Sequence, residues 1–144
     1  MSITEQTDID VTAIASRLFE HLEEAWNAAD GAASGEVFAD ETEFVNIRGE
    51  HFTGNGVTIG RAHQGIFDTI YAGSTMRYAI DVVREITPGS IIAVVTSTLD
   101  APTGPLQGVN QSRITVVITD QTSTEQAGDW RIIAFQNTLV MNIV

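Results

Sequence analysis

The hydrophobic pattern of this 144-residue chain changes near its middle from a helical period to an extended one. In the first half, apolar residues recur at three- and four-residue spacing over residues 11–29 and 57–71, which predicts two amphipathic helices. The second half contains four β-rich runs separated by turn signals, at residues 76–86, 91–99, 107–119 and 130–143. Helices followed by an antiparallel meander are typical of an α+β domain, in which a curved sheet wraps the helices.

Local signals complete the expected order of elements. Thr7 is placed to cap the first helix. A short helix ending near Phe38 and two short strands over residues 42–54 should precede the second long helix, which makes about three helices. No repeat or linker divides the chain, so residues 1–144 are predicted to form a single domain, with 1–7 as a disordered tail.

The charge distribution argues against two classes of partner. The chain carries seven basic residues, all of them Arg, against nineteen acidic ones, for a formal net charge of -12. A phosphate backbone or an anionic membrane surface needs clustered positive charge, whereas these arginines are scattered singly among acids. We therefore expect neither nucleic acid nor a membrane as a partner.

The sequence also argues against several kinds of site. Cysteine is absent, which rules out disulfides, thiolate metal ligands and a thiol nucleophile. There is no glycine-rich dinucleotide loop or phosphate loop, and His21, His51 and His63 are too separated for a local metal motif. We expect no cofactor and no metal. The first residues lack the basic start and apolar core of a signal peptide, so a cytoplasmic location is expected.

The last β-rich run carries apolar residues on both alternating faces. One set is Trp130, Ile132, Ala134, Gln136 and Thr138, and the other is Arg131, Ile133, Phe135, Asn137 and Leu139. The helices can cover only one face of the sheet, so a second copy of the chain is expected to cover the outer face in a homodimer. The alternative is that this strand lies centrally in the sheet beneath loops.

Five segments occur in an order that resembles a known superfamily. They are AWNAAD at 25–30, FADETEFVNIRGEHFTG at 38–54, AHQGIF at 62–67, IYAGS at 70–74 and DWRIIAFQNT at 129–138. Together they resemble the nuclear-transport-factor-like proteins, specifically the SnoaL-like members and their SgcJ/EcaC branch, which is associated with bacterial enediyne and other polyketide pathways. One departure is Asn55, which stands where a basic residue is expected at the start of the third helix.

The resemblance implies a cone of sheet around three helices, with a ligand cavity at the wide end and usually a dimeric assembly. Members of the superfamily include isomerases, cyclases and dehydratases, and also proteins that only bind or scaffold. The fold therefore does not determine the chemistry.

His63 is the most informative polar residue in the sequence. Helical spacing places it on the apolar face of the second long helix, with Ile59 and Phe67, and it should point inward. An inward imidazole can contact a ligand or move a proton near neutral pH. It can also form a purely structural hydrogen bond inside the core. The pattern leaves both roles open.

Other candidate cavity residues come from the first helix and the strands. Phe44 and Asn46 share one strand face, while Trp26 and Tyr78 are placed to form walls. Tyr78 can also donate a hydrogen bond to an oxyanion. Arg113 can anchor a carboxylate or enolate oxygen, or it can form an ion pair at the sheet edge or dimer interface.

Gln136 and Asn137 form a further pair of candidates for ligand binding. Neighbours on a strand face opposite sides, so only one of the two can point into the cavity. Asn137 groups with Phe135 and Gln136 with Ala134, and the sequence does not decide between them.

These residues lead to one interpretation and two alternatives. We interpret the chain as a dimeric pocket protein that acts on or sequesters an apolar metabolite of polyketide type. An isomerase, cyclase or dehydratase would use His63 as general acid or base, with Asn46 or Arg113 steadying an enolate. No acidic residue is predicted to point inward, which favours binding over that reaction. The second alternative is an assembly module with a vestigial pocket.

Overall fold

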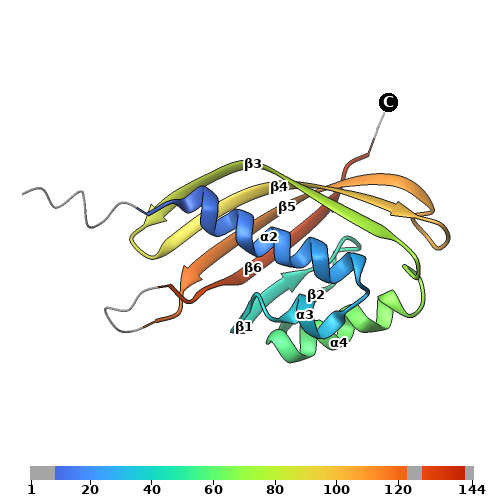
Figure 1. The fold of residues 1–144 in the computed structure, drawn as a ribbon, viewed down its shortest axis with the longest axis horizontal. Helices are drawn as coiled ribbons and strands as arrows, with labels where there is room; N and C mark the ends of the chain where they lie inside the picture. The colour runs from blue at the N-terminus through green and yellow to red at the C-terminus, as the bar shows by residue number, and fades with distance from the viewer. Residues whose placement is uncertain (1–8, 123–127, 142–144) are drawn as a thin grey trace, which may run out of the picture.

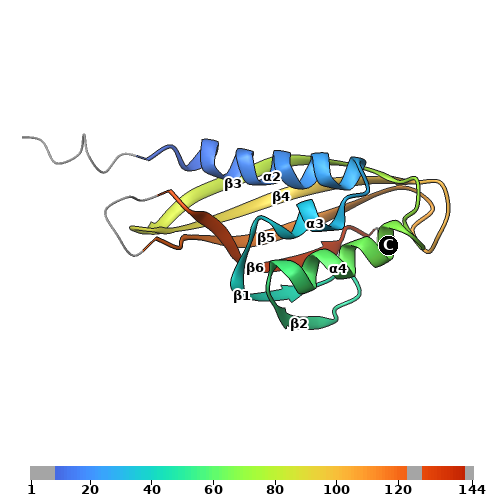
Figure 2. The same cartoon turned by 60° about the horizontal axis from the view of Figure 1, so that its bottom comes forward.

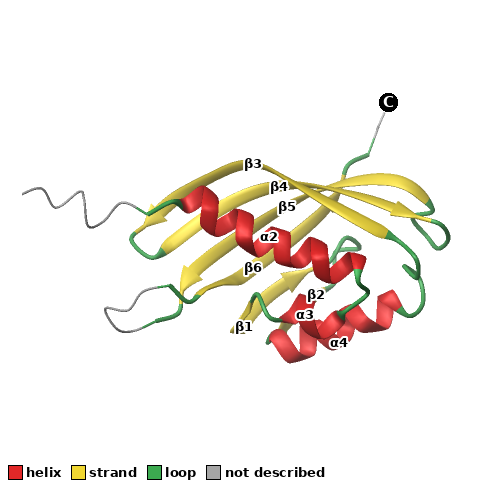
Figure 3. Cartoon of the chain, in the orientation of Figure 1, coloured by secondary structure: helices red, strands yellow, loops and turns green. Residues whose placement is uncertain are grey.

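The computed structural model describes residues 9–122 and 128–141 and shows one six-stranded sheet curved around three helices (Figures 1 and 2). The helices are α2 (Val11–Asn27), α3 (Gly31–Gly35) and α4 (Gly56–Phe67). The strands are β1 (Phe38–Val45), β2 (His51–Gly54), β3 (Thr75–Thr87), β4 (Ser90–Ala101), β5 (Gly108–Asp120) and β6 (Trp130–Leu139). Figure 3 shows the three helices on the same face of the sheet, and the predicted α+β cone is confirmed. The tail predicted at 1–7 and the Thr7 cap lie outside the described residues.

The sheet is mixed, with strand order β2-β1-β6-β5-β4-β3. Strands β3 to β6 form the predicted antiparallel meander. Strand β1, however, pairs in parallel with β6, so the prediction of a wholly antiparallel sheet is wrong for this pair. The two strands are far apart in the sequence, and the alternation of side chains along a strand carries no information about the direction of a distant partner.

Side-chain caps fix where the two long helices begin. The Asp10 Oδ1 accepts a hydrogen bond from the Ala13 backbone N at 3.0 Å and starts α2. Asn55 starts α4 through a capping box, in which its Oδ1 accepts from the Thr58 N while the Thr58 Oγ1 accepts from the Asn55 N, both at 3.0 Å. The residue that departs from the superfamily pattern therefore shapes the start of this helix.

Glycines allow α3 and α4 to approach each other closely. A Cβ atom on Gly60 would lie only 2.6 Å from the Gly31 carbonyl oxygen, so the backbones are in direct contact at this point. The Gln64 Oε1 also accepts a hydrogen bond from the Gly31 N at 2.8 Å. With this side of α4 held against α3, the neighbouring residue His63 lies on the side that faces the sheet.

Two clusters of buried apolar side chains occupy the concave face of the sheet. The larger cluster fills the space between α2 and the central strands and includes Phe19, Val95 and Ile114. The smaller cluster consists of Trp26, Phe67, Met76, Leu99 and Ala101. It lies toward the C-terminal end of α2, where the interior is not completely filled by side chains.

A bulge in β6 changes which residues of this strand face inward. Val117 lies opposite Ala134, but the next residue of β5, Ile118, lies opposite Ile132, so Ile133 is an extra residue in β6. Ile132 and Phe135 are therefore both buried, although strict alternation assigned them to opposite faces. The prediction of two separate alternating sets is wrong across this bulge. Because Ile132 and Phe135 are both in the core, the outer face of β6 carries fewer apolar residues than the sequence pattern indicated.

Candidate functional site

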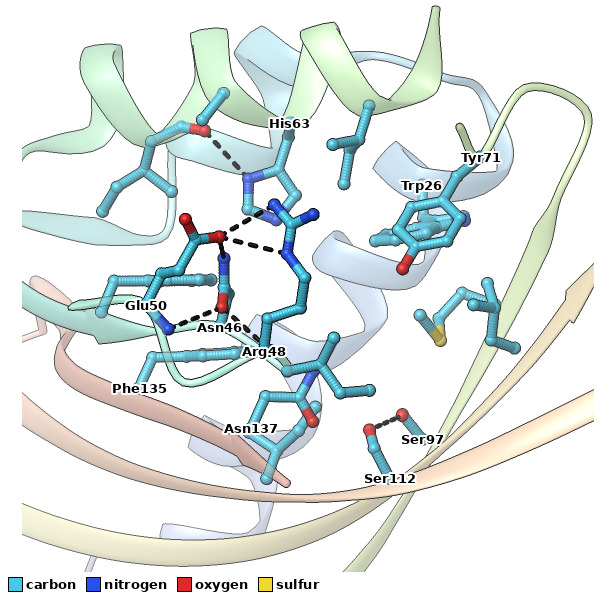
Figure 4. Close-up of a pocket in the computed structure, with 18 of the residues that line it drawn as sticks. Trp26, Asn46, Arg48, Glu50, His63, Tyr71, Ser97, Ser112, Phe135 and Asn137 are labelled. Atoms are coloured by element: carbon cyan, nitrogen blue, oxygen red, sulfur yellow. Dashed lines mark hydrogen bonds and ion pairs between the residues drawn. The ribbon is translucent and has the colours of Figure 1, made fainter. Parts of the chain in front are cut away.

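A cavity of about 410 Å³ lies at the wide end of the cone, between the β1–β2 hairpin, α4, the end of α2 and the inner faces of β3 to β6 (Figure 4). Its volume falls within the range of small-molecule pockets, roughly 300–1,000 Å³. The exposed lining residues mark its mouth: Arg48, Glu50, Phe52 and Thr53 on the hairpin, Thr58 and Ala62 on α4, and Gln111 on β5. The deeper walls are mainly apolar, with Met76 and Leu99 among them.

Aromatic rings form much of the wall. Phe44 and Phe135 stack with ring centroids 4.5 Å apart and planes 4° apart. The Trp26 ring lies 5.8 Å from Tyr71, and the His63 imidazole is edge-on to Phe44 at 5.7 Å. Such contacts hold the rings in defined orientations, against which an aromatic ligand can pack face to face or edge to face.

The protonation of His63 follows from its surroundings. Its Nδ1 lies 2.9 Å from the Ile59 carbonyl oxygen, which can only accept a hydrogen bond, so Nδ1 carries a proton. Burial lowers the pKa of His63 below its ordinary value, and the weaker opposing effect is the hydrogen bond to Ile59. The neutral ring that results has an unprotonated Nε2. This nitrogen is an acceptor of hydrogen bonds and, chemically, a base.

A network of hydrogen bonds among Asn46, Arg48 and Glu50 stabilises the hairpin at the mouth of the cavity. The Glu50 Oε1 accepts hydrogen bonds from the Asn46 Nδ2 at 3.0 Å and from the Arg48 Nη2 at 2.8 Å. The Asn46 Oδ1 in turn accepts from the backbone N of Arg48 and of Glu50, each at 3.0 Å. Asn46 first and Arg48 second hold the pKa of the Glu50 carboxyl below its usual range. The polar groups of Asn46 are therefore engaged within the protein.

Three residues with hydroxyl groups line the strand side of the cavity. Tyr78, Ser97 and Ser112 lie opposite one another on β3, β4 and β5, and the Oγ atoms of the two serines are 2.5 Å apart. Burial first, and the Glu23 carboxylate second, raise the pKa of Tyr78, so its hydroxyl remains a hydrogen-bond donor. Nearby on β6, the Asn137 Oδ1 is buried and has no hydrogen-bond partner. This strip is the polar part of an otherwise apolar wall.

The structure brings together most of the residues predicted to surround a ligand. The cavity is lined by Trp26, Phe44, Asn46, His63, Tyr78 and Asn137. The choice left open on β6 is resolved in favour of Asn137, because Gln136 lies opposite Thr115 on the outer face and is exposed.

Arg113 does not line the cavity, and its predicted place there is wrong. Its neighbours Ser112 and Ile114 are both buried on the inner face of β5, so the Arg113 side chain extends from the outer face, where it is exposed. It lies opposite Thr96 on β4 and Thr138 on β6. It cannot steady an enolate inside the cavity.

Sequence reasoning missed several residues of this site. Tyr71 follows the end of α4, and Arg48 and Glu50 belong to a turn, where neither a helical nor an extended period applies. Ser97 had a signal, because it is a small polar residue at an inward position between Val95 and Leu99, whereas Ser112 follows Asn110 on its strand face and stands out less. Glu50 is the one carboxylate among the described residues that line the cavity, and it is bound to Arg48.

The described residues provide neither a metal site nor a membrane-spanning helix. Within residues 9–122 and 128–141, no group of three His, Asp or Glu side chains is arranged to hold a metal ion. None of the described helices is long and apolar enough to cross a membrane.

The fold is shared with many solved structures, although no protein-family model and no curated protein matches the sequence. A domain of unknown function with a cystatin-like fold from Nostoc punctiforme superposes with a TM-score of 0.80 at 20% identity, covering 95% of this chain and 82% of that one. An uncharacterized protein with a cystatin-like fold from Caulobacter vibrioides has a TM-score of 0.77 at 28% identity, covering 91% and 90%. A putative scytalone dehydratase from Novosphingobium aromaticivorans has a TM-score of 0.69 at 12% identity, covering 90% and 84%. The chain has the cystatin-like fold.

Proposed function

We propose that this protein binds a small, largely apolar organic molecule in the cavity between α4 and the sheet. The observation that carries the proposal is the cavity itself: about 410 Å³ of space walled by oriented aromatic rings, with a few polar groups directed into it. Apolar surface left facing an unfilled cavity gains free energy when a ligand of matching shape replaces water there. The open interior therefore favours ligand binding over the reading as an assembly module.

The class of ligand follows from the sequence resemblance and the cavity wall together. We assign the ligand to apolar metabolites of polyketide type, as in the enediyne-associated branch, and we place the protein in the cytoplasm. One protein with this fold is named as a putative scytalone dehydratase, and this name supports the proposal that the cavity of the fold binds a small organic molecule.

Naphthalene is a suitable probe, because it has the required planar shape and no polar group. Equilibrium dialysis should show saturable binding to the unmodified protein. Ile66→Trp puts an indole into the cavity wall and should weaken naphthalene binding at least about tenfold, since it occupies the space. Val57→Trp is the matched control, because Val57 is 62% exposed on the same helix and does not line this cavity. Failure of the unmodified protein to bind naphthalene at all contradicts the proposal.

A second candidate function is favoured by His63. Its neutral ring, with Nε2 unprotonated, is suited to take a proton from a bound carbon acid. Tyr78 is a donor for the enolate oxygen, and so is the Ser97–Ser112 pair, which has one hydroxyl hydrogen left after the bond between the two serines. The test is hydrogen–deuterium exchange at the carbon beside the carbonyl of 2-tetralone, followed by NMR. Exchange that is lost in His63→Gln supports an isomerase-type enzyme. Exchange no faster than in buffer supports a binding protein.

We also propose a homodimer formed through the outer face of the sheet. None of the described helices covers this face (Figure 2), and it carries Val82 opposite Val94 and Ile92 opposite Val117. Val82 is 50% exposed in the single chain. A second copy of the same face would bury this apolar surface.

A further inference from the structure

We infer that the ligand is an uncharged aromatic molecule with a hydroxyl group, and that this hydroxyl donates a hydrogen bond to the Nε2 atom of His63. The inference rests on the proposed binding function and narrows it from apolar molecules in general to those that carry a donor on a flat ring. It depends on which nitrogen of the imidazole is already engaged, on the polar group across the cavity, on the charges around the site and on the aromatic rings of the wall.

The first step concerns the direction of the hydrogen bond at His63. The Ile59 carbonyl, one turn earlier in α4, takes the Nδ1 proton at 2.9 Å and fixes both the tautomer and the orientation of the ring. None of the described residues donates to Nε2. The remaining nitrogen is therefore an acceptor, and a ligand carbonyl placed there would oppose lone pair to lone pair. A ligand hydroxyl would complete the pair.

The second step concerns the opposite wall. Figure 4 shows His63 on the α4 side and Asn137 on the strand side of the same cavity. The Asn137 Oδ1 has no partner among the described residues, but it is buried and not accessible from the cavity. Asn137 can therefore meet a ligand only through its amide NH2 group, which donates hydrogen bonds. The acceptor that calls for a donor on the ligand is thus on the His63 side of the cavity.

The third step excludes a charged ligand. A buried anion needs a cation, and Arg48, the arginine that lines the cavity, is already paired with Glu50 at 2.8 Å. A buried cation needs an anion, and Glu50, the carboxylate that lines the cavity, is already bound to Arg48. With these charges matched to each other, a neutral ligand enters at the lowest desolvation cost.

The fourth step concerns the shape of the ligand. Aromatic rings surround His63 in the cavity: the Phe44 ring lies 5.7 Å from the imidazole at an interplanar angle of 89°, and the Trp26 ring lies 6.3 Å from it. A flat aromatic ligand can pack against these rings, and a hydroxyl group in the plane of the ligand ring can at the same time donate to Nε2.

Two probes of nearly equal size test the inference by equilibrium dialysis at pH 7.5. 2-Naphthol and 2-methylnaphthalene differ by a hydroxyl in place of a methyl group, and the methyl compound is the more hydrophobic. We expect 2-naphthol to bind about tenfold more tightly, because only it supplies the donor. His63→Phe keeps a ring but removes the acceptor, and it should abolish this preference while leaving binding of 2-methylnaphthalene intact. His63→Gln keeps an acceptor and should restore part of the preference.

The outcomes separate this inference from the proposed function. If 2-methylnaphthalene binds as tightly as 2-naphthol or more tightly, the ligand does not need a hydroxyl group, and the proposed binding of apolar molecules still holds. A preference for 2-naphthol that persists in His63→Phe overturns the role of His63. Binding of neither probe, with naphthalene also unbound, contradicts the proposed function itself. Circular dichroism of each variant identifies loss of folding, in which case the comparison of the two probes on the unmodified protein still decides the requirement.

Discussion

Phe44 of β1 and Phe135 of β6 lie directly opposite each other in the parallel strand pair, and their rings stack at 4.5 Å. This contact joins the first strand of the chain to the last and forms part of the cavity wall at the same time. Stability and ligand binding therefore depend on the same pair of rings.

A double-mutant cycle should detect this coupling. Phe135 is 7% exposed, so Phe135→Ala should lower the free energy of unfolding by about 3 kcal/mol, and Phe44→Ala by less, because Phe44 is only half-buried. The double variant should lose about 1 kcal/mol less than the sum, the typical energy of an aromatic pair. Denaturant unfolding measures all three variants. Phe44 and Phe19 form the control pair, because the Phe19 ring packs against Tyr78 and not against Phe44, and their substitutions should be additive.

A second prediction concerns the glycine contact between α3 and α4. Gly60→Ala should destabilise the protein by about 1–3 kcal/mol, because the added Cβ would lie 2.6 Å from the Gly31 carbonyl oxygen. Gly65→Ala on the same helix meets nothing within 4 Å and should stabilise it by about 0.5–1 kcal/mol. Thermal unfolding compares the two. Similar effects from both substitutions would mean that the helices are not in close contact.

A third prediction follows from the lowered pKa of His63. Burial disfavours the protonated ring in the folded state, so the unfolded chain takes up this proton at a higher pH than the folded chain does. The stability contribution is fully present above the unfolded pKa, near 6.5, and is lost as the pH falls through the folded pKa. Denaturant unfolding between pH 8 and 5 should thus show a steeper loss for the unmodified protein than for His63→Gln. Parallel curves for the two proteins would refute the burial of this ring.

A fourth prediction concerns the hydrogen-bond network of Asn46, Arg48 and Glu50 at the mouth of the cavity. Asn46→Ala removes the hydrogen bond that contributes most to the lowered pKa of Glu50, so that pKa should rise toward its ordinary value. Arg48→Gln should shift the pKa in the same direction, because it removes both the guanidinium hydrogen bond and the positive charge. NMR titration of the Glu50 carboxyl carbon measures both. The pKa of Glu43, which is lowered by Thr53 and His51, serves as the internal control and should not change.

A fifth prediction tests the proposed dimer. Val94 lies on the outer face opposite Val82 and Thr115, so Val94→Asp should convert a dimer into a monomer. Sedimentation equilibrium measures the mass of each species. Val57→Asp changes an exposed valine on α4 and should leave the mass unchanged. If the unmodified protein is a monomer, the outer face is not a dimer interface.

The sequence predicted the elements well because each has a strong local period. The long helices and the four-stranded meander appear close to their expected positions, and the inward orientation of His63 followed from helical spacing alone. The same reasoning placed Trp26, Phe44 and Tyr78 around one cavity. These are all residues whose orientation is set by their own helix or strand.

The misplaced residues depend on information that a local period does not contain. The parallel pairing of β1 with β6 is a contact between distant segments, and the extra residue Ile133 interrupts an alternation that otherwise looks regular. Arg113 was assigned by its chemistry rather than by its neighbours Ser112 and Ile114, whose burial places it outside. The hydrogen-bond network around Arg48 depends on the geometry of a turn, and a turn has no periodic pattern in the sequence.

The bulge at Ile133 has a consequence for how this protein could evolve. Because Ile118 lies opposite Ile132 and Val117 opposite Ala134, deleting Ile133 would leave the other pairings of β6 unchanged, with Phe135 and Asn137 still facing the cavity. A deletion of one residue beyond the bulge would instead exchange the two faces for all the residues of β6 that follow it. A change of length at the bulge therefore leaves the binding surface intact, whereas the same change a few residues later alters it.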